Sequence, residues 1–209
     1  MYKNYLFDLD GTLTDSAPGI KNSIKYSLAK AQLPMLDEQT LDKFIGPPLH
    51  ESYEKYCNLS PEQADGLVSL YREYFGVTGL FENSVYDGIP ETLDALRLRG
   101  KRLFVATSKP EVYAKRILEH FGLIDKFDFV GGSTMTHERT DKAEVIDYVI
   151  RSAALEPEET VMVGDRFYDV DGAHKNGLDV IGVLFGFGDA DELSNADHIA
   201  AVPSDILEI

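Results

Sequence analysis

The chain has 209 residues, of which 44% are hydrophobic, and its formal net charge is −16 at pH 7. This composition excludes a disordered chain. The chain is long enough for one domain plus an insertion or a small second domain. The acidic balance disfavours nonspecific binding to nucleic acid or anionic membranes. Since no apolar run approaches the roughly 18 residues of a membrane span and no signal peptide is recognisable, we expect no membrane association. The single Cys57 suits a reducing compartment, so we expect a cytoplasmic protein.

The chain opens with a short aromatic-rich run, Tyr2 to Phe7, that predicts a buried strand, and Gly11 permits a sharp turn after it. Asp8 and Asp10 stand on alternate positions after this strand, so in an extended chain their side chains share a face. Two carboxylates this close repel each other, and burying them requires a cation, a lysine or hydrogen-bond donors. The spacing alone also allows a solvated acidic turn.

The next segment, from residue 16 to about residue 83, has the apolar spacing of helices and no strand pattern. Ser60 is a plausible N-cap, with Pro61 and Gln63 completing a capping-box pattern. This segment therefore predicts a small helical insertion. Its helices are expected to begin near Ser16, near Asp37, at His50 and at Pro61.

The rest of the chain alternates strand and helix patterns, which predicts a parallel sheet covered on both faces. The expected strands are Arg102–Ala106, Phe127–Val130, Thr160–Val163, Val180–Leu184 and His198–Val202. The expected helices are Pro90–Arg99, Pro110–Phe121, Lys142–Ala154, Val170–Asn176 and Asp191–Ala196.

Polar residues follow several of these strands, where ligands bind in such a sheet. Thr107 and Ser108 could hold an anion together with the backbone amides of the next helix, although Ser108 could also simply cap that helix. Lys142 would open a helix, where a positive charge opposes the helix dipole, and a charge against local preference hints at function. The alternative is an exposed lysine paired with Asp141 or Glu138.

Two further acids, Asp165 and Asp169, follow the strand near Val163. They could contribute to a site at this edge of the sheet, or they could simply cap the next helix. With Asp8 and Asp10 they would bring up to four negative charges together against the one positive charge of Lys142. A divalent cation is then needed, and all-oxygen ligands beside a phosphate favour Mg²⁺. The sequence has no histidine and cysteine cluster of the zinc type.

The run Asp8-Leu9-Asp10-Gly11-Thr12 resembles the first signature of the haloacid dehalogenase-like hydrolases, and the stretches around Thr107, Lys142 and Asp165 match three further signatures in order. Phe7–Ser16 and Phe44–Leu49 are similar to the phosphoglycolate phosphatase branch. The resemblance implies an α/β fold with a Rossmann-like parallel-sheet core, formed by residues 1–15 and 84–209. It also implies that residues 16–83 form a mobile helical cap inserted after the first strand.

The resemblance also implies roles for the residues that match the signatures. Asp8 would be the nucleophile and Asp10 the general acid and base. The phosphate would be bound by Thr107, Ser108 and Lys142. The metal ligands would be Asp8, the backbone carbonyl of Asp10 and Asp165, with Asp169 in support.

These roles predict a Mg²⁺-dependent phosphatase that hydrolyses small-molecule phosphate monoesters through an aspartyl-phosphate, with phosphoglycolate as the main substrate candidate. The dehalogenase and phosphonate-cleaving branches lack the second acid, so Asp10 points to phosphoryl transfer. A 5′-nucleotidase acting on nucleoside monophosphates and a sugar phosphomutase remain alternatives. A phospho-acceptor signalling module is the alternative without enzymatic activity, and the helical insertion argues against it. Arg166 departs from the family, which often has a small polar residue there, and no feature indicates an oligomeric state.

Overall fold

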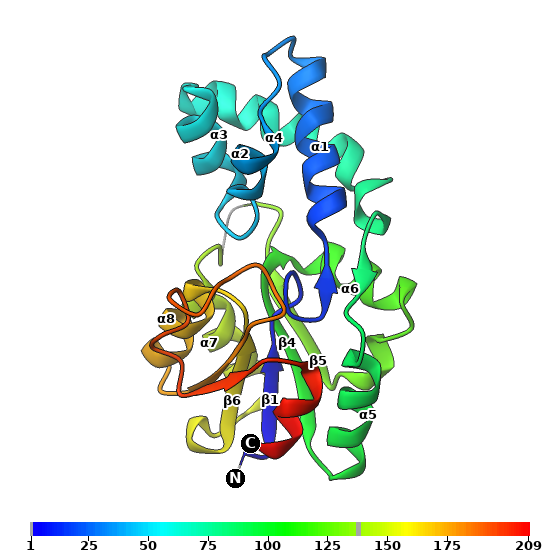
Figure 1. The fold of residues 1–209 in the computed structure, drawn as a ribbon, viewed down its shortest axis with the longest axis vertical. Helices are drawn as coiled ribbons and strands as arrows, with labels where there is room; N and C mark the ends of the chain where they lie inside the picture. The colour runs from blue at the N-terminus through cyan, green and yellow to red at the C-terminus, as the bar shows by residue number, and fades with distance from the viewer. Residues whose placement is uncertain (1, 137–138) are drawn as a thin grey trace. The chain divides into compact units, whose positions relative to one another are not determined.

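The structure is a computed structural model that describes residues 2–136 and 139–209. Its contacts divide the chain into two compact units, Met1–Asp15 with Val85–Ile209 and, inserted between them, Ser16–Ser84. The first unit is an α/β domain and the second is built from helices (Figure 1). Among the described residues, no helix has both the length and the apolar character needed to cross a bilayer.

The α/β unit is organised around a sheet of six parallel strands in the order β5-β4-β1-β6-β7-β8. The first strand of the chain lies inside this sheet, since β1 pairs with β4 on one side and with β6 on the other (Figure 1). The prediction of an α/β fold with a parallel sheet is confirmed. The strands are β1 (Asn4–Phe7), β4 (Arg102–Pro110), β5 (Phe129–Ser133), β6 (Thr160–Gly164), β7 (Asp179–Val183) and β8 (His198–Ala200).

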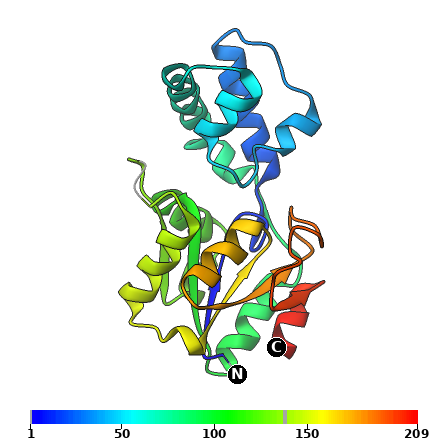
Figure 2. The ribbon, with the colours of Figure 1, turned by 90° about the vertical axis from the view of Figure 1, so that its left-hand side faces the viewer.

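Helices cover both faces of the sheet, as the alternation of strands and helices requires. In Figure 2 helices α7 and α8 lie in front of the sheet, on the face to which Leu6 contributes its side chain. Phe7 points to the opposite face, because successive residues of a strand alternate, and its ring meets Phe127 there at 6.3 Å. The helices of this unit are α5 (Ile89–Leu98), α6 (Glu111–His120), α7 (Lys142–Ala153) and α8 (Phe167–Lys175).

The inserted unit has its own apolar core. Tyr53 and Phe44 pack edge to face at 5.2 Å, and the Tyr53 hydroxyl forms a buried hydrogen bond of 2.6 Å with Ser27. The capping box at Ser60 is present, because its side chain accepts from the Gln63 amide and its own amide donates to the Gln63 side chain. The helices are α1 (Ala17–Lys30), α2 (Glu38–Asp42), α3 (Leu49–Cys57) and α4 (Pro61–Phe75).

Besides shifts of a few residues at the ends of several elements, the structure differs from the sequence predictions in three places. Strand β4 continues to Pro110, with a register shift against β5 after Thr107. The predicted helix over 191–196 is wrong: this stretch consists of turns, because its backbone bonds do not continue an i→i−4 ladder. Two short strands, β2 (Thr14–Asp15) and β3 (Ser84–Val85), pair with each other and are too short for a sequence period to reveal. The short 3₁₀ helices are η1 (Gly79–Phe81), η2 (Ile124–Lys126), η3 (Pro157–Glu159) and η4 (Pro203–Glu208).

Candidate active site

The predicted site residues lie along the edge of the sheet formed by the carboxyl ends of its strands. Asp8 follows β1, Asp165 follows β6, and Lys142 is the first residue of α7. Gly11, with φ of +84°, brings the turn after β1 against Asp165, where an added Cβ would meet a carboxylate oxygen at 2.2 Å. A glycine at this position is therefore required both by its backbone angle and by its close approach to Asp165.

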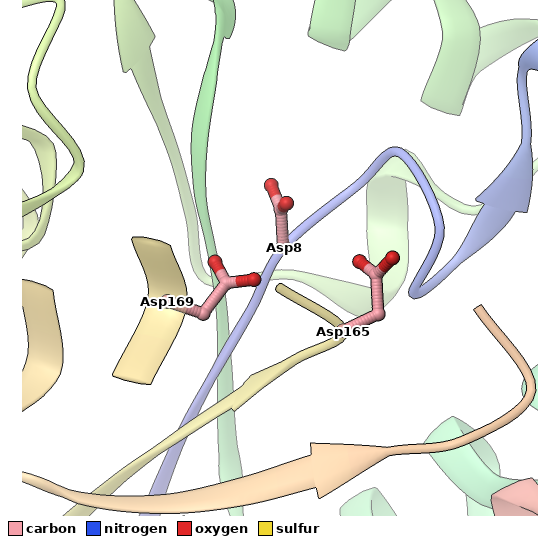
Figure 3. Close-up of side chains that lie close together, drawn as sticks. All are labelled: Asp8, Asp165 and Asp169. Carbon is pink, nitrogen blue, oxygen red and sulfur yellow. The ribbon is translucent and has the colours of Figure 1, made fainter. Parts of the chain in front are cut away.

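Three buried carboxylates converge at this edge. One oxygen from each of Asp8, Asp165 and Asp169 lies within 4.8 Å of the others. Figure 3 shows these groups at neighbouring points, carried by the end of β1, by the segment after β6 and by α8. The Nζ of Lys142 lies 2.8 Å from Asp8 Oδ1 and 2.7 Å from Asp169 Oδ1, and it donates to the carbonyl of Ala106 at 3.0 Å. We refer to Asp8, Asp165, Asp169 and Lys142 as the acidic cluster.

Lys142 is buried at the N-terminus of α7, so the alternative of an exposed surface lysine does not hold. Its proposed partner Asp141 instead caps the helix, because its carboxylate accepts from the Ala143 amide at 2.7 Å. The other proposed partner, Glu138, lies outside the described residues.

Asp169 caps the next helix, as one of the two sequence interpretations predicted, and it also contacts Lys142. Its Oδ2 accepts from the Arg166 amide at 3.0 Å, which caps the start of α8, while its Oδ1 contacts Lys142. Asp165 is held by two donors, the Thr12 hydroxyl at 3.1 Å and the Phe187 amide at 2.8 Å. Both acids are therefore fixed by hydrogen bonds.

The electrostatics of the acidic cluster follow from three neighbouring buried acids, of which Asp8 and Asp169 share the one lysine. Burial, then the charges of Asp169 and Asp8, raise the pKa of Asp165 to about 8. Burial also raises the pKa of Asp169 to about 6, although Lys142 opposes the rise. Burial alone would lower the pKa of Lys142, but the charges of Asp169 and Asp8 outweigh it and raise this pKa. The cluster thus has a surplus of negative charge that a cation would neutralise.

The acidic cluster has the chemistry of a site for a hard divalent cation. Carboxylate oxygens are the ligands such cations prefer, and each oxygen has more than one lone pair to offer. The three oxygens lie within 4.8 Å of one another, and opposite oxygens around Mg²⁺ are roughly 4.2 Å apart. Small side-chain adjustments would therefore let these residues share one ion.

Asp10 has a partner that the sequence analysis missed. Its Oδ2 forms an ion pair of 2.6 Å with the Nζ of Lys109, whose side chain is only 6% exposed. The other oxygen of Asp10, Oδ1, is buried and has no hydrogen-bond partner among residues 2–136 and 139–209. Lys109 stands two positions after Thr107, in the part of β4 where the register against β5 shifts, so strand alternation alone does not indicate where its side chain points.

Thr107 is buried inside β4, and its hydroxyl accepts from the Lys109 amide at 3.3 Å. Ser108 does not cap α6, because the N-cap of this helix is Pro110 and no side chain bonds there. Arg166, whose direction the sequence left open, pairs with Glu192 at 2.8 Å. The same Glu192 oxygen accepts from the Phe167 amide at 2.9 Å, so Arg166 helps to anchor the loop that carries Glu192.

The fold and the acidic cluster define a hydrolase of the α/β class, and comparison with known proteins identifies its family. Residues 5–183 match the model of the haloacid dehalogenase-like hydrolases, and the chain belongs to this family. The family resemblance and the prediction of a hydrolase of the phosphatase kind are confirmed. A phosphate ester is accordingly its class of substrate.

Several relatives cover most of the chain. The 5′-nucleotidase of Pseudomonas aeruginosa is 46% identical over 92% of this chain and 87% of its own length. The tyrosine-protein kinase PtkA of Mycobacterium tuberculosis is 41% identical over 89% of this chain, which spans only 63% of the kinase. The phosphoglycolate phosphatase of Rhodospirillum rubrum is 33% identical over 90% of this chain and 81% of its own. The crystal structure of a predicted phosphatase from Clostridium acetobutylicum has 46% identity and a TM-score of 0.94, covering 100% of both chains.

Proposed function

We propose that this protein is a Mg²⁺-dependent phosphatase that hydrolyses nucleoside 5′-monophosphates through an aspartyl-phosphate on Asp8. The observation that carries the chemistry is the buried acidic cluster, in which Lys142 contacts the nucleophile. The sequence analysis favoured phosphoglycolate as substrate, but identity is higher to a 5′-nucleotidase, at 46%, than to a phosphoglycolate phosphatase, at 33%. This comparison supports the nucleotidase alternative, and phosphoglycolate becomes the second candidate.

The first half of the reaction is the transfer of the phosphoryl group to Asp8. Lys142 holds Oδ1 of Asp8 at 2.8 Å, which orients the carboxylate so that Oδ2 attacks phosphorus in line. The bond from Asp8 to phosphorus forms as the ester bond breaks. Asp10 gives a proton to the leaving oxygen, and its Oδ1 is the oxygen that Lys109 leaves free to carry this proton.

The second half of the reaction is hydrolysis of the aspartyl-phosphate. Asp10, now ionised, accepts a proton from the water that attacks phosphorus. The bond between phosphorus and the Asp8 oxygen breaks, and inorganic phosphate leaves. Lys142 and the hydroxyls of Thr107 and Ser108 would bind the phosphoryl oxygens, whose charge spreads in the transition state.

Asp8, Asp165 and the backbone carbonyl of Asp10 would hold the Mg²⁺ ion, and Asp169 would support them through Lys142 and its hydrogen bond at the start of α8. When bound, Mg²⁺ neutralises the surplus charge of the acidic cluster and polarises a phosphoryl oxygen.

The helical unit Ser16–Ser84 would act as a mobile cap over the site, a role supported by its separate core and its insertion between Asp15 and Val85. A cytoplasmic location also belongs to this proposal, and the free Cys57 supports it.

The proposal is tested by phosphate release from nucleoside monophosphates, phosphoglycolate and sugar phosphates, each with Mg²⁺ and with EDTA. We expect metal-dependent release that is fastest with nucleotides and lost in Asp8→Asn. Asp171→Asn is a matched control, because Asp171 lies on the surface in an ion pair with Lys175. Near-normal release by Asp8→Asn would contradict the mechanism, and a preference for phosphoglycolate would restore that substrate.

A further inference from the structure

A cavity of about 300 Å³ lies in the α/β unit, at the carboxyl ends of β4 and β5. Its walls include Glu111 from the first turn of α6, Ser133 from the end of β5, and Arg139 and Tyr148 from the segment before α7 and from α7 itself. This volume is at the lower end of the range for ligand pockets. The proposed mechanism assigns nothing to this cavity.

Arg139 is the residue that marks the cavity as a binding site. Its guanidinium carbon lies 3.8 Å from the ring centroid of Tyr148, so the two groups stack. Its Nε is buried and has no hydrogen-bond partner among the described residues. Leaving such a donor unsatisfied destabilises the folded protein. Arg139 also has φ of +53°, an unfavourable backbone conformation for this residue type that recurs at functional sites.

The wall of the cavity adjoins the segment that carries Lys109. A Cβ on Gly132 would lie 2.6 Å from the carbonyl of Lys109 and 2.8 Å from Glu111, so β5 packs directly against the segment that carries Lys109. Lys109 in turn contacts Asp10. Strands β5 and β1 are two positions apart in the sheet, which puts the end of β5 about 10 Å from the end of β1.

The distance of about 10 Å between the ends of β1 and β5 determines which leaving groups can reach the cavity. The glycolate group ends about 4 Å beyond its ester oxygen when bonds of about 1.5 Å are added along the chain. A nucleoside carries a sugar ring and a base, and it is roughly two to three times as long. Only the longer group reaches from a phosphoryl group at Asp8 to the end of β5.

The lining of the cavity favours the same class of ligand. A base or ribose offers acceptors to the guanidinium of Arg139, which lines the cavity, and a planar base stacks on guanidinium and aromatic groups. The Glu111 carboxylate, which pairs with Lys115 at 2.6 Å, also lines the cavity and disfavours a second carboxylate there.

We propose that this cavity receives the nucleoside part of the substrate, and that Arg139 on Tyr148 determines the preference for nucleoside monophosphates over short phosphate esters. This inference rests on the proposed function, since it assigns the leaving group of the same reaction. Arg139 is a specificity-determining residue that does not touch the reacting atoms.

The test compares kcat/KM for uridine and adenosine 5′-monophosphates with kcat/KM for methyl phosphate in the wild type, Arg139→Ala and Arg139→Gln. We expect the ratio of nucleotide to methyl phosphate to fall about 10- to 100-fold in both variants, mainly through KM, as the loss of a charged hydrogen bond predicts. Inhibition by free uridine or adenosine should weaken in parallel. Arg151→Ala is the matched control, because Arg151 lies on α7, the helix that carries Tyr148, and its 79% exposed side chain pairs with Asp147. Arg139→Gln keeps part of the side-chain stem and provides a second variant if Arg139→Ala folds poorly.

The outcomes separate this inference from the proposed function. An unchanged ratio and unchanged nucleoside inhibition in both Arg139 variants, with phosphate still released from all esters, would overturn the subsite and leave the phosphatase intact. Absence of phosphate release from every ester by the wild type would overturn the phosphatase, and the subsite with it.

Discussion

The two acids that follow β1 have different charge environments although a single residue separates them. Asp8 shares Lys142 with Asp169 and also lies near the buried Asp165, so its surroundings have a surplus of negative charge. Asp10 has its own cation, Lys109, at 2.6 Å, and its surroundings are close to balanced. The difference shows where a divalent cation would neutralise surplus charge, which is on the Asp8 side. It also shows where a proton can be moved without one, which is on the Asp10 side.

The largest effect is expected from removing the one lysine of the acidic cluster. Lys142→Met would leave Asp8 and Asp169 buried without their cation, and breaking such a buried pair costs about 3–5 kcal/mol. We expect the Tm to fall by about 10 °C in thermal unfolding, together with loss of turnover. Lys25→Met removes an exposed ion pair of the same 2.7 Å length and should change Tm by about 2 °C or less. An equal fall in Tm for the two substitutions would show that Asp8 and Asp169 do not depend on Lys142 to balance their charge.

The next effect concerns proton transfer by Asp10. Asp10→Asn should lower kcat about 10²- to 10⁴-fold with alkyl phosphates, because the leaving alkoxide then lacks its acid. The loss should be much smaller for the first half-reaction with an aryl ester, whose phenolate leaves without protonation. A burst of phenolate in rapid-mixing kinetics would measure this directly. An equal loss with both kinds of ester would instead assign Asp10 to binding.

The pH dependence of stability tests the surplus of negative charge around Asp8. The pKa of Asp165 is about 8 in the folded state, above its usual value of 3.8, so the folded protein retains a proton that the unfolded chain has released. The contribution of Asp165 to stability is therefore fully present below about pH 4 and is lost as pH rises to about 8. We expect the Tm of the metal-free protein to fall over this window more steeply than that of Asp165→Asn.

Mg²⁺ should reverse this loss, because it neutralises the ionised acids. At a concentration 100 times its dissociation constant it would add about 2.7 kcal/mol, or about 5–10 °C in Tm near pH 8. The increase should be smaller at pH 5, where protons compete with the ion. An increase that is independent of pH, or as large in Asp165→Asn, would place the binding site elsewhere.

The sequence was sufficient to predict which residues converge on the Asp8 side. Asp8 and Asp165 follow buried apolar runs, and the carboxyl ends of parallel strands share one edge, so their proximity depends only on strand period and topology. Lys142 could be singled out because its charge opposes the dipole of the helix it begins.

The Asp10 side and the cavity could not be predicted in the same way. Lys109 lies in the irregular end of β4, where pairing with β5 shifts register after Thr107, so its direction depends on tertiary packing. The stacking of Arg139 on Tyr148 joins a segment with an unusual backbone angle to a helix, and no periodic pattern encodes it. Glu192 lies in a stretch with the pattern of a helix, but the stretch consists of turns and the Glu192 side chain is held by Arg166 and the Phe167 amide.

The smallest effect on activity is expected from replacing Lys109, which tests the Asp10–Lys109 ion pair directly. Lys109→Met should lower kcat about tenfold, about 1.4 kcal/mol, with little change in KM, because Asp10 loses the contact that fixes its Oδ2. Lys109→Arg should restore part of the rate, which a merely structural loss would not allow. Lys175→Met, which breaks an exposed ion pair of the same 2.6 Å length, should leave kcat unchanged. If Lys109→Met raises KM and leaves kcat intact, Lys109 binds substrate. The ion pair of Lys109 with Asp10 would then serve substrate binding more than proton transfer.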